Sequence, residues 1–240
     1  MRVDIEPAIM YFGTPVVLIS TLNEDGTTNI APISSVWWLG WSCMIGIDAT
    51  SHTTKNLKRN GQCVLNLASA ELAQQVNALA LLTGSEELPL HKKMLGYKSV
   101  KDKFVHSGLT PQTSDQDKEN EKPSAIKECP IQLEVTVESF NSFGHNDARM
   151  AVPAYAIELK INRVSVMPQV LQDGSKNKID PNKWNPLIMN FRKLYSLTSE
   201  LSESRLAHKP EALYAPWKQK GLKRLIGSFL LGRSNKRHSH

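Results

Sequence analysis

Strict alternation of apolar and polar side chains is the feature that most constrains how this chain can fold. Apolar residues occupy every second position of residues 131–137, and the pattern returns at residues 155–161. A period of two is typical of a half-buried antiparallel strand, because successive side chains point to opposite faces of a sheet. The sequence lacks the regular alternation of strand and helix patterns that is typical of a parallel sheet. The sequence therefore predicts an antiparallel barrel or an α+β fold.

The first third of the chain also predicts strands joined by tight turns. Residues 16–20 are a β-branched run, residues 23–26 (Asn-Glu-Asp-Gly) predict a turn, and residues 27–36 predict the second strand of a hairpin. Pro32 lies in this second strand and cannot donate to a ladder, which indicates a sheet edge or a bulge. Two more buried strands are predicted at residues 41–47 and 62–67.

Helical patterns are inserted between and after these strands. Ser69 predicts the N-cap of a helix that ends at Gly84, and a second helix is predicted after Pro186, over an apolar pattern at residues 187–194. Residues 112–128 are rich in Asp, Lys, Glu, Asn and Ser, which predicts a solvated loop. The predicted class is thus mainly β, with inserted helices.

Composition narrows the kind of protein. The 240 residues are 40% hydrophobic and 22% charged, which is typical of a soluble globular chain. No apolar run approaches the roughly 18 residues of a membrane-spanning helix, and the start lacks a secretory pattern, so a cytoplasmic location is expected. The three cysteines form no C-x-x-C pair and no two histidines have the spacing of a site on one helix face, so no metal site is predicted.

The net charge of +6 is concentrated in a tail. Residues 212–240 hold seven basic side chains and no acid, which leaves −1 for the rest. A nucleic-acid-binding barrel is therefore an alternative that only the tail supports, and no nucleic-acid partner is expected. We divide the chain into a barrel domain, residues 1–205, and a basic extension, residues 206–240. Apolar residues at helical spacing predict an amphipathic helix in the extension: Leu222, Leu225, Ile226, Phe229 and Leu230. Docking of this helix on its own barrel or on a second subunit is favoured over contact with an anionic membrane surface.

One segment carries residues suited to an anion. Ser51, Thr53, Thr54 and Lys55 follow a predicted strand and begin a polar, helical segment. Hydroxyls, an ammonium and the free amides of a helix N-terminus suit a phosphate. The alternative from these residues alone is an ordinary N-cap with a solvated lysine.

The order of six segments resembles the flavin reductase-like family of FMN-binding split barrels. They span residues 10–197: TPVVLISTLNEDGTTNIAPISS, IGIDATSHTTKNLKRNGQCVLNLAS, ELAQQVNALALLTG, HKKMLGYKSVKDKF, IQLEVTVESF and IDPNKWNPLIMNFRKLY. The resemblance implies a Greek-key antiparallel split β-barrel, a homodimer, bound FMN, and reduction of flavin by NADH or NADPH or a related flavin-mediated electron transfer. A small-molecule electron acceptor or a partner oxygenase would take the electrons. The alternative function is a non-enzymatic protein that stores or senses FMN.

The same resemblance assigns residues to the cofactor. It places Asn29, Ala31, Ser34 and Ser35 beside the isoalloxazine ring and the ribityl chain, with Pro32 freeing backbone groups toward the ring. It places Ser51, Thr53, Thr54 and Lys55 at the phosphate, with Asp48 and Ala49 between the two groups. Some family members carry a Gly-Asp-His stretch whose histidine lies near the nicotinamide or the substrate; here the matching region is Phe143-Gly144-His145-Asn146. His145 is thus the catalytic candidate, without the preceding acid. Core or interface packing is expected for Trp37, Trp38 and Trp41.

Overall fold

The structure is a computed structural model that describes residues 2–113, 122–150 and 152–204. Residues 1–198 form one compact unit, and residues 199–204 are the described part of a second unit. The predicted helix of the basic extension, residues 206–240, lies outside the described residues. Among the described helices, none is long and apolar enough to cross a membrane.

The first unit contains a large antiparallel sheet, which confirms the predicted mainly β class. Its strand order is β3-β2-β6-β11-β12-β5-β4, and every neighbouring pair is antiparallel. The strands are β2 (Val17–Leu22), β3 (Thr28–Ile33), β4 (Val36–Leu39), β5 (Ser42–Asp48), β6 (Gln62–Leu67), β11 (Ile131–Phe143) and β12 (Ala154–Val166). Pro32 lies in β3, which ends the strand order, so its predicted place at a sheet edge is confirmed.

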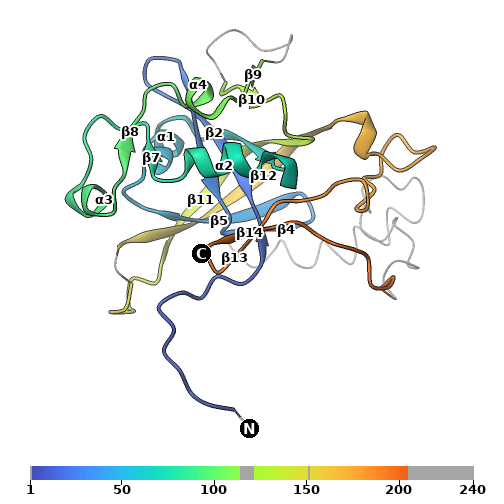
Figure 1. The fold of residues 1–240 in the computed structure, drawn as a ribbon. Coiled ribbons are helices and arrows are strands. Elements are labelled where there is room, and N and C mark those ends of the chain that lie inside the picture. Colours follow the sequence, from blue (N-terminus) through green and yellow to red (C-terminus); the bar gives the residue numbers. More distant parts are fainter. Residues whose placement is uncertain (1, 114–121, 151, 205–240) are drawn as a thin grey trace, which may run out of the picture. The chain divides into compact units, whose positions relative to one another are not determined.

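Shorter elements surround this sheet. The helices are α1 (His52–Asn60), α2 (Ala73–Leu79), α3 (Leu90–Met94) and α4 (Lys103–Ser107), with 3-10 turns η1 (Ala70–Leu72) and η2 (Pro168–Val170). The small strands are β1 (Thr14–Pro15), β7 (Leu82–Thr83), β8 (Lys98–Ser99), β9 (Pro111–Gln112), β10 (Ala125–Ile126), β13 (Ile188–Asn190) and β14 (Lys193–Tyr195). Figure 1 shows α1, α2 and α4 gathered on one side of the sheet, where α2 and α4 contact each other and β3.

Two hydrophobic cores follow from the alternation along the strands. In β2 the buried Val17 and Ile19 belong to the core that also contains Leu65 and Leu133, which lie on β6 and β11. The flanking Val16 and Leu18 point the other way, into a second core with residues of α2 and α4. Because both faces of the sheet are covered here by apolar side chains, residues 16–19 are a continuous apolar run rather than an alternating one.

The structure corrects three element predictions. The helix expected from Ser69 to Gly84 is η1 followed by α2, which ends at Leu79, and the Ser69 side chain makes no capping hydrogen bond. The strand expected over residues 27–36 is interrupted after β3, and β4 begins at Val36. The helix expected after Pro186 is wrong: β13 and β14 form a hairpin there, because Phe191 and Arg192 turn the chain with positive φ values.

Candidate functional site

A cavity of about 500 Å³ opens between β3, the start of α1, the end of α2 and the β13–β14 hairpin. Its volume lies in the range of small-molecule sites. Seven of the residues predicted to bind the cofactor line it: Ala31, Pro32, Ser34, Ser35, Asp48, Ser51 and Thr53. The floor is apolar at Ile19, Ile33 and Ile47, so hydroxyls and aliphatic groups share one wall. Such a lining can accept a flat, partly apolar ring together with polar substituents.

The two threonines at the N-terminus of α1, Thr53 and Thr54, have different surroundings. Ser51 is the N-cap, and its Oγ accepts a hydrogen bond from the Thr54 amide at 3.0 Å. The hydroxyl of Thr54 donates to the Asp48 carbonyl at 2.8 Å, and this side chain is fully buried. Thr53 lies on the cavity wall, whereas Lys55 is exposed and does not line the cavity. The amides of His52 and Thr53, by contrast, have no intrahelical acceptor, which leaves them suited to an anion.

An ion pair crosses the cavity lining. Lys92 of α3 is 7% exposed, and its Nζ lies 3.1 Å from Asp48 Oδ2. Burial acts to raise the pKa of Asp48, but hydrogen bonds from Thr50 and Lys92 outweigh it and hold that pKa below its ordinary value. Asp48 therefore stays ionised and compensates the charge of Lys92.

Lys103 is a second buried cation in the lining. It begins α4, is 3% exposed, and donates from Nζ to the Ile30 carbonyl at 3.0 Å. Burial, with the nearby Lys92, lowers the pKa of Lys103 to about 8. Unlike Lys92, Lys103 makes no ion pair among the described residues. An anion that enters the cavity would supply the missing compensation.

His52 lines the cavity, and it packs with Asn29 against Gly84. His52 Nε2 lies 2.8 Å from Asn23 Oδ1, an acceptor that also receives the Asn56 amide. Burial, then the positive charges of Lys103 and Lys55, lowers the pKa of His52. Asn29 Oδ1 is buried and has no hydrogen-bond partner among the described residues. It packs so closely on Gly84 that a Cβ there would lie 2.7 Å from it.

The N-terminal segment joins the site through Tyr11. Its hydroxyl bonds Ser34 Oγ at 2.7 Å and Ser35 Oγ at 2.8 Å, and all three residues line the cavity. Arg192, on the β13–β14 turn, also lines the cavity and is exposed. The lining of described residues thus contains three cations, Lys92, Lys103 and Arg192, and one carboxylate, Asp48.

A second cavity of about 270 Å³ contains two other predicted residues. Ala49 and His145 line it together with Phe143, Asp147 and Tyr155. It flanks the main cavity, because Asp48 lines the one and Ala49 the other. His145 is exposed and does not line the main cavity, so a catalytic role for it stays a prediction. The predicted cofactor residues outside both cavities are Asn29, Thr54 and Lys55.

Sequence reasoning missed the three cations and Tyr11. Lys92 and Lys103 lie in polar stretches that look solvated, and burial of a lysine leaves no trace in residue periodicity. The only signal was that both fall within the HKKMLGYKSVKDKF segment on which the family resemblance partly rests. The three tryptophans near β4 differ in their environments. Trp38 packs against the core, whereas Trp37 and Trp41 are exposed. No group of three or more potential metal ligands occurs among the described residues.

The cavity and the antiparallel sheet define the class of protein. A family model, the flavin reductase like domain, matches residues 9–158. The chain therefore belongs to the flavin reductase-like family, whose members are flavin-linked oxidoreductases with the split-barrel fold. The resemblance noted from the six sequence segments is thereby confirmed.

Three proteins illustrate what the chain is similar to in sequence and in fold. It is 35% identical over 201 residues to the uncharacterized protein YdfE of Bacillus subtilis, covering 84% of this chain and 92% of that protein. Its fold is similar to that of flavoredoxin from Desulfovibrio vulgaris, with a TM-score of 0.66, 19% identity, and coverage of 87% and 100%. Nitrilotriacetate monooxygenase component B from Bacillus cereus has a TM-score of 0.64, 15% identity, and coverage of 85% and 99%.

Proposed function

We propose that the chain binds FMN in the main cavity and acts as an NAD(P)H-dependent flavin reductase or a related flavin-mediated electron carrier. The observation that carries the proposal is the lining of that cavity: an apolar floor, a row of hydroxyls and the start of α1, with two buried lysines beside them. These groups fit FMN, which joins a flat, partly apolar ring to a polyhydroxyl chain and a phosphate of nearly two negative charges. When bound, FMN supplies the capacity to accept a hydride and pass electrons on.

The residues of the chain would bind and orient the cofactor. The hydroxyl of Thr53 and the amides of His52 and Thr53 are the proposed phosphate donors; the Ser51 hydroxyl, which lies 2.8 Å from Thr54 Oγ1, would turn toward the phosphate to join them. Lys103 supplies a charge that no described carboxylate compensates. Tyr11 positions Ser34 and Ser35 on the wall assigned to the ring and ribityl chain. Lys55 and Thr54 stay predicted phosphate residues, although one is exposed and the other bonds inward.

The proposal also names the partners. A homodimer is expected, and the electrons would pass to a small-molecule acceptor or to a partner oxygenase. The fold shared with a monooxygenase component B favours the second route, since the name of that protein describes one component of a monooxygenase. A cytoplasmic location is part of the same proposal.

Steady oxidation of NADH or NADPH by the purified protein with added FMN tests the proposal. We expect turnover that depends on both the donor and the flavin and that rises with protein concentration. Tight FMN binding without any oxidation of either donor would favour the alternative, a protein that stores or senses flavin. The His145→Gln variant, compared in the same assay, tests the proposed catalytic role of His145: unchanged turnover would remove that role.

A further inference from the structure

We propose that Arg192 binds an anionic group, a carboxylate or a phosphate, of the second reactant that exchanges electrons with the flavin. The inference rests on the proposed flavin site and adds the charge of the molecule that meets the flavin there. Arg192 lines the main cavity and is exposed at its mouth. Among the described residues its guanidinium makes no ion pair or hydrogen bond, so it is available to a ligand.

The backbone at Arg192 is the first observation. β13 and β14 pair directly at Asn190 and Lys193, which leaves a two-residue loop of Phe191 and Arg192. Their φ values are 45° and 64°, in the left-handed region. Two-residue hairpin loops with positive φ favour glycine, asparagine or aspartate, and other side chains are strained there. The chain thus keeps a cation at a position where glycine would relieve strain.

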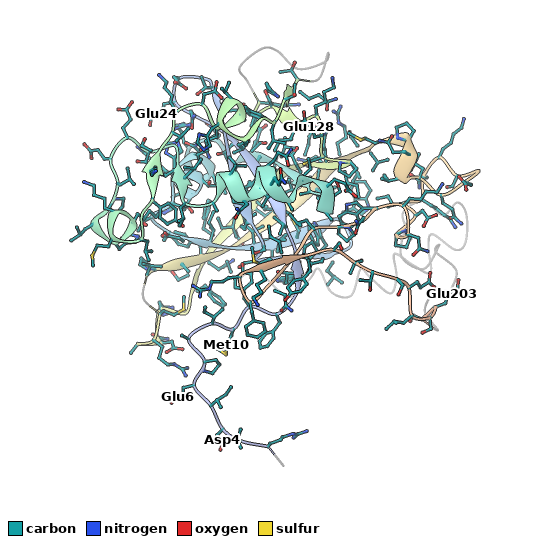
Figure 2. The ribbon with its side chains drawn as sticks, viewed as in Figure 1. Asp4, Glu6, Met10, Glu24, Glu128 and Glu203 are labelled. Carbon is teal, nitrogen blue, oxygen red and sulfur yellow. The ribbon has the colours of Figure 1, made fainter. Side chains whose placement is uncertain are left out.

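The loop is fixed in place by the N-terminal segment. The Phe191 amide donates to the Tyr11 carbonyl at 2.7 Å. The rings of Phe12 and Phe191 meet edge to face, with centroids 5.3 Å apart. Figure 2 shows the segment leading away from the sheet at Met10, Glu6 and Asp4, so these contacts hold its base. Since the Tyr11 hydroxyl bonds Ser34 and Ser35, the loop is tied to the wall proposed for the ring.

The other two cations of the cavity differ from Arg192 in their contacts and their burial. Lys92 pairs with Asp48, and Lys103 bonds the carbonyl of Ile30. Both lysines are buried inside the lining, whereas Arg192 is exposed. The cofactor's phosphate, proposed at the start of α1 with Lys103, is therefore served by groups other than Arg192. The remaining cation at the mouth is left for a different anion.

Binding to the FMN-loaded protein tests this inference without requiring turnover. Two pairs of probes are titrated calorimetrically into wild type and Arg192→Gly: benzoate against neutral benzamide, and NAD⁺ against nicotinamide. We expect the affinity for at least one charged probe to fall five- to fiftyfold, because a charge-assisted bond is lost at a partly solvated site. The neutral probes should change less than twofold. Arg192→Lys should restore part of the affinity, and Lys193→Gln, an exposed charge next to the loop but outside the cavity lining, should leave it unchanged.

The outcomes identify the anion. Loss for benzoate alone indicates a carboxylate reactant, loss for NAD⁺ alone indicates the phosphates of a nicotinamide donor, and loss for both indicates a shared subsite. Charged probes that fail to bind wild type, or that bind Arg192→Gly equally well, would overturn the inference. Thermal unfolding of Arg192→Gly at or above the wild-type temperature excludes misfolding as the cause, because glycine relieves the strained φ.

FMN titration separates the two proposals. Arg192→Gly should bind FMN as tightly as wild type does. A parallel loss of FMN affinity would mean that Arg192 holds the cofactor's own phosphate, and would overturn the assignment to a second reactant. Failure of wild type to bind FMN at all would contradict the proposed function, and this inference with it.

Discussion

At the scale of single residues, buried charge decides what the cavity can hold. Lys92 and Lys103 are both less than a tenth exposed, yet only Lys92 has a carboxylate partner among the described residues. A buried, uncompensated ammonium is costly, and the lowered pKa of Lys103 expresses that cost. A bound anion would raise the pKa of Lys103 again, because it favours the charged form. A phosphate bound near Lys103 would therefore lower the free-energy cost of keeping this ammonium buried.

The pKa of Lys103 gives a pH prediction for stability. The folded value of about 8 lies below the ordinary 10.5, so between these values the unfolded chain binds more protons than the folded chain. The free energy of unfolding of flavin-free protein should therefore rise with pH across that window, by up to about 3 kcal/mol. Urea denaturation of wild type and Lys103→Met over pH 7 to 10.5 measures this. A pH dependence that is the same in both proteins would contradict it.

The same residue makes FMN affinity pH-dependent. A phosphate near Lys103 favours its charged form, so FMN affinity should change little between about pH 7 and pH 8, where the phosphate is a dianion. Above about pH 8 FMN should bind more weakly as Lys103 loses its proton. Riboflavin, which lacks the phosphate, should show no such decline. Fluorescence titrations of both flavins at fixed ionic strength test this; a parallel decline for the two flavins would place Lys103 away from the phosphate.

Gly84 makes a prediction about close packing. An added Cβ would lie 2.7 Å from Asn29 Oδ1 and 2.9 Å from His52 Cδ2, so Gly84→Ala must displace one of them. We expect a loss of about 1 to 3 kcal/mol in unfolding free energy from this overpacking, together with weaker FMN binding. Gly13→Ala is the control, since its Cβ would meet only Ile188 at 3.4 Å. Equal stability of the two variants in urea denaturation would show that the neighbours of Gly84 move freely.

At the scale of elements, the start of α1 shows which features can be predicted from local sequence patterns. Ser51 was predicted as an N-cap or an anion ligand, and the structure makes it the N-cap on the cavity wall. The alternating strands were also predicted from their pattern, because burial of one face leaves a direct trace in residue order. The hairpin at residues 188–195 could not be predicted in this way, because its apolar spacing also fits a helix. The positive φ values of Phe191 and Arg192, which turn the chain into a hairpin, are visible only in the structure. Contacts distant in sequence, such as Lys103 with Ile30, leave no local trace.

The two neighbouring threonines of α1 should respond differently to substitution. Thr53→Ala should leave stability nearly unchanged and weaken FMN by roughly tenfold or more if a charge-assisted hydrogen bond to the phosphate is lost. Thr54→Ala removes a buried hydroxyl that bonds Asp48, so it should cost about 1 to 3 kcal/mol of unfolding free energy.

FMN and riboflavin titrations together with urea denaturation separate these effects. The matched comparison is the ratio of FMN to riboflavin affinity in each variant. Discrimination that survives Thr53→Ala but vanishes in folded Thr54→Ala would reverse the assignment and support the inner threonine as a ligand.

At the scale of the whole molecule, the expected homodimer needs an exposed apolar surface, and β4 offers one. β4 ends the strand order of the described sheet, and Trp37 and Leu39 on it are 56% and 76% exposed. An edge strand with exposed apolar side chains favours association with another chain. In Figure 1, β4 lies apart from α4, so pairing along β4 would leave α4 exposed.

Trp37→Glu tests whether this edge joins two copies. We expect wild type to have the mass of a dimer by light scattering after gel filtration, and Trp37→Glu to shift the equilibrium toward monomer at micromolar concentrations. Val105→Glu, at a more exposed apolar position on α4, is the control and should remain dimeric. A monomeric wild type, or a variant that remains dimeric, would remove β4 from the interface.

The preference for FMN over riboflavin tests the central claim most directly, because the two ligands differ only by the phosphate for which the start of α1 and Lys103 are assigned. Flavin-fluorescence titration of wild type and of a Thr53→Ala, Lys103→Met double variant, both verified as folded by circular dichroism, measures it. We predict that wild type binds FMN at least tenfold more tightly than riboflavin, and that this ratio collapses in the variant while riboflavin affinity is retained. Equal affinity of wild type for the two flavins, or an undiminished ratio in the variant, would contradict the account.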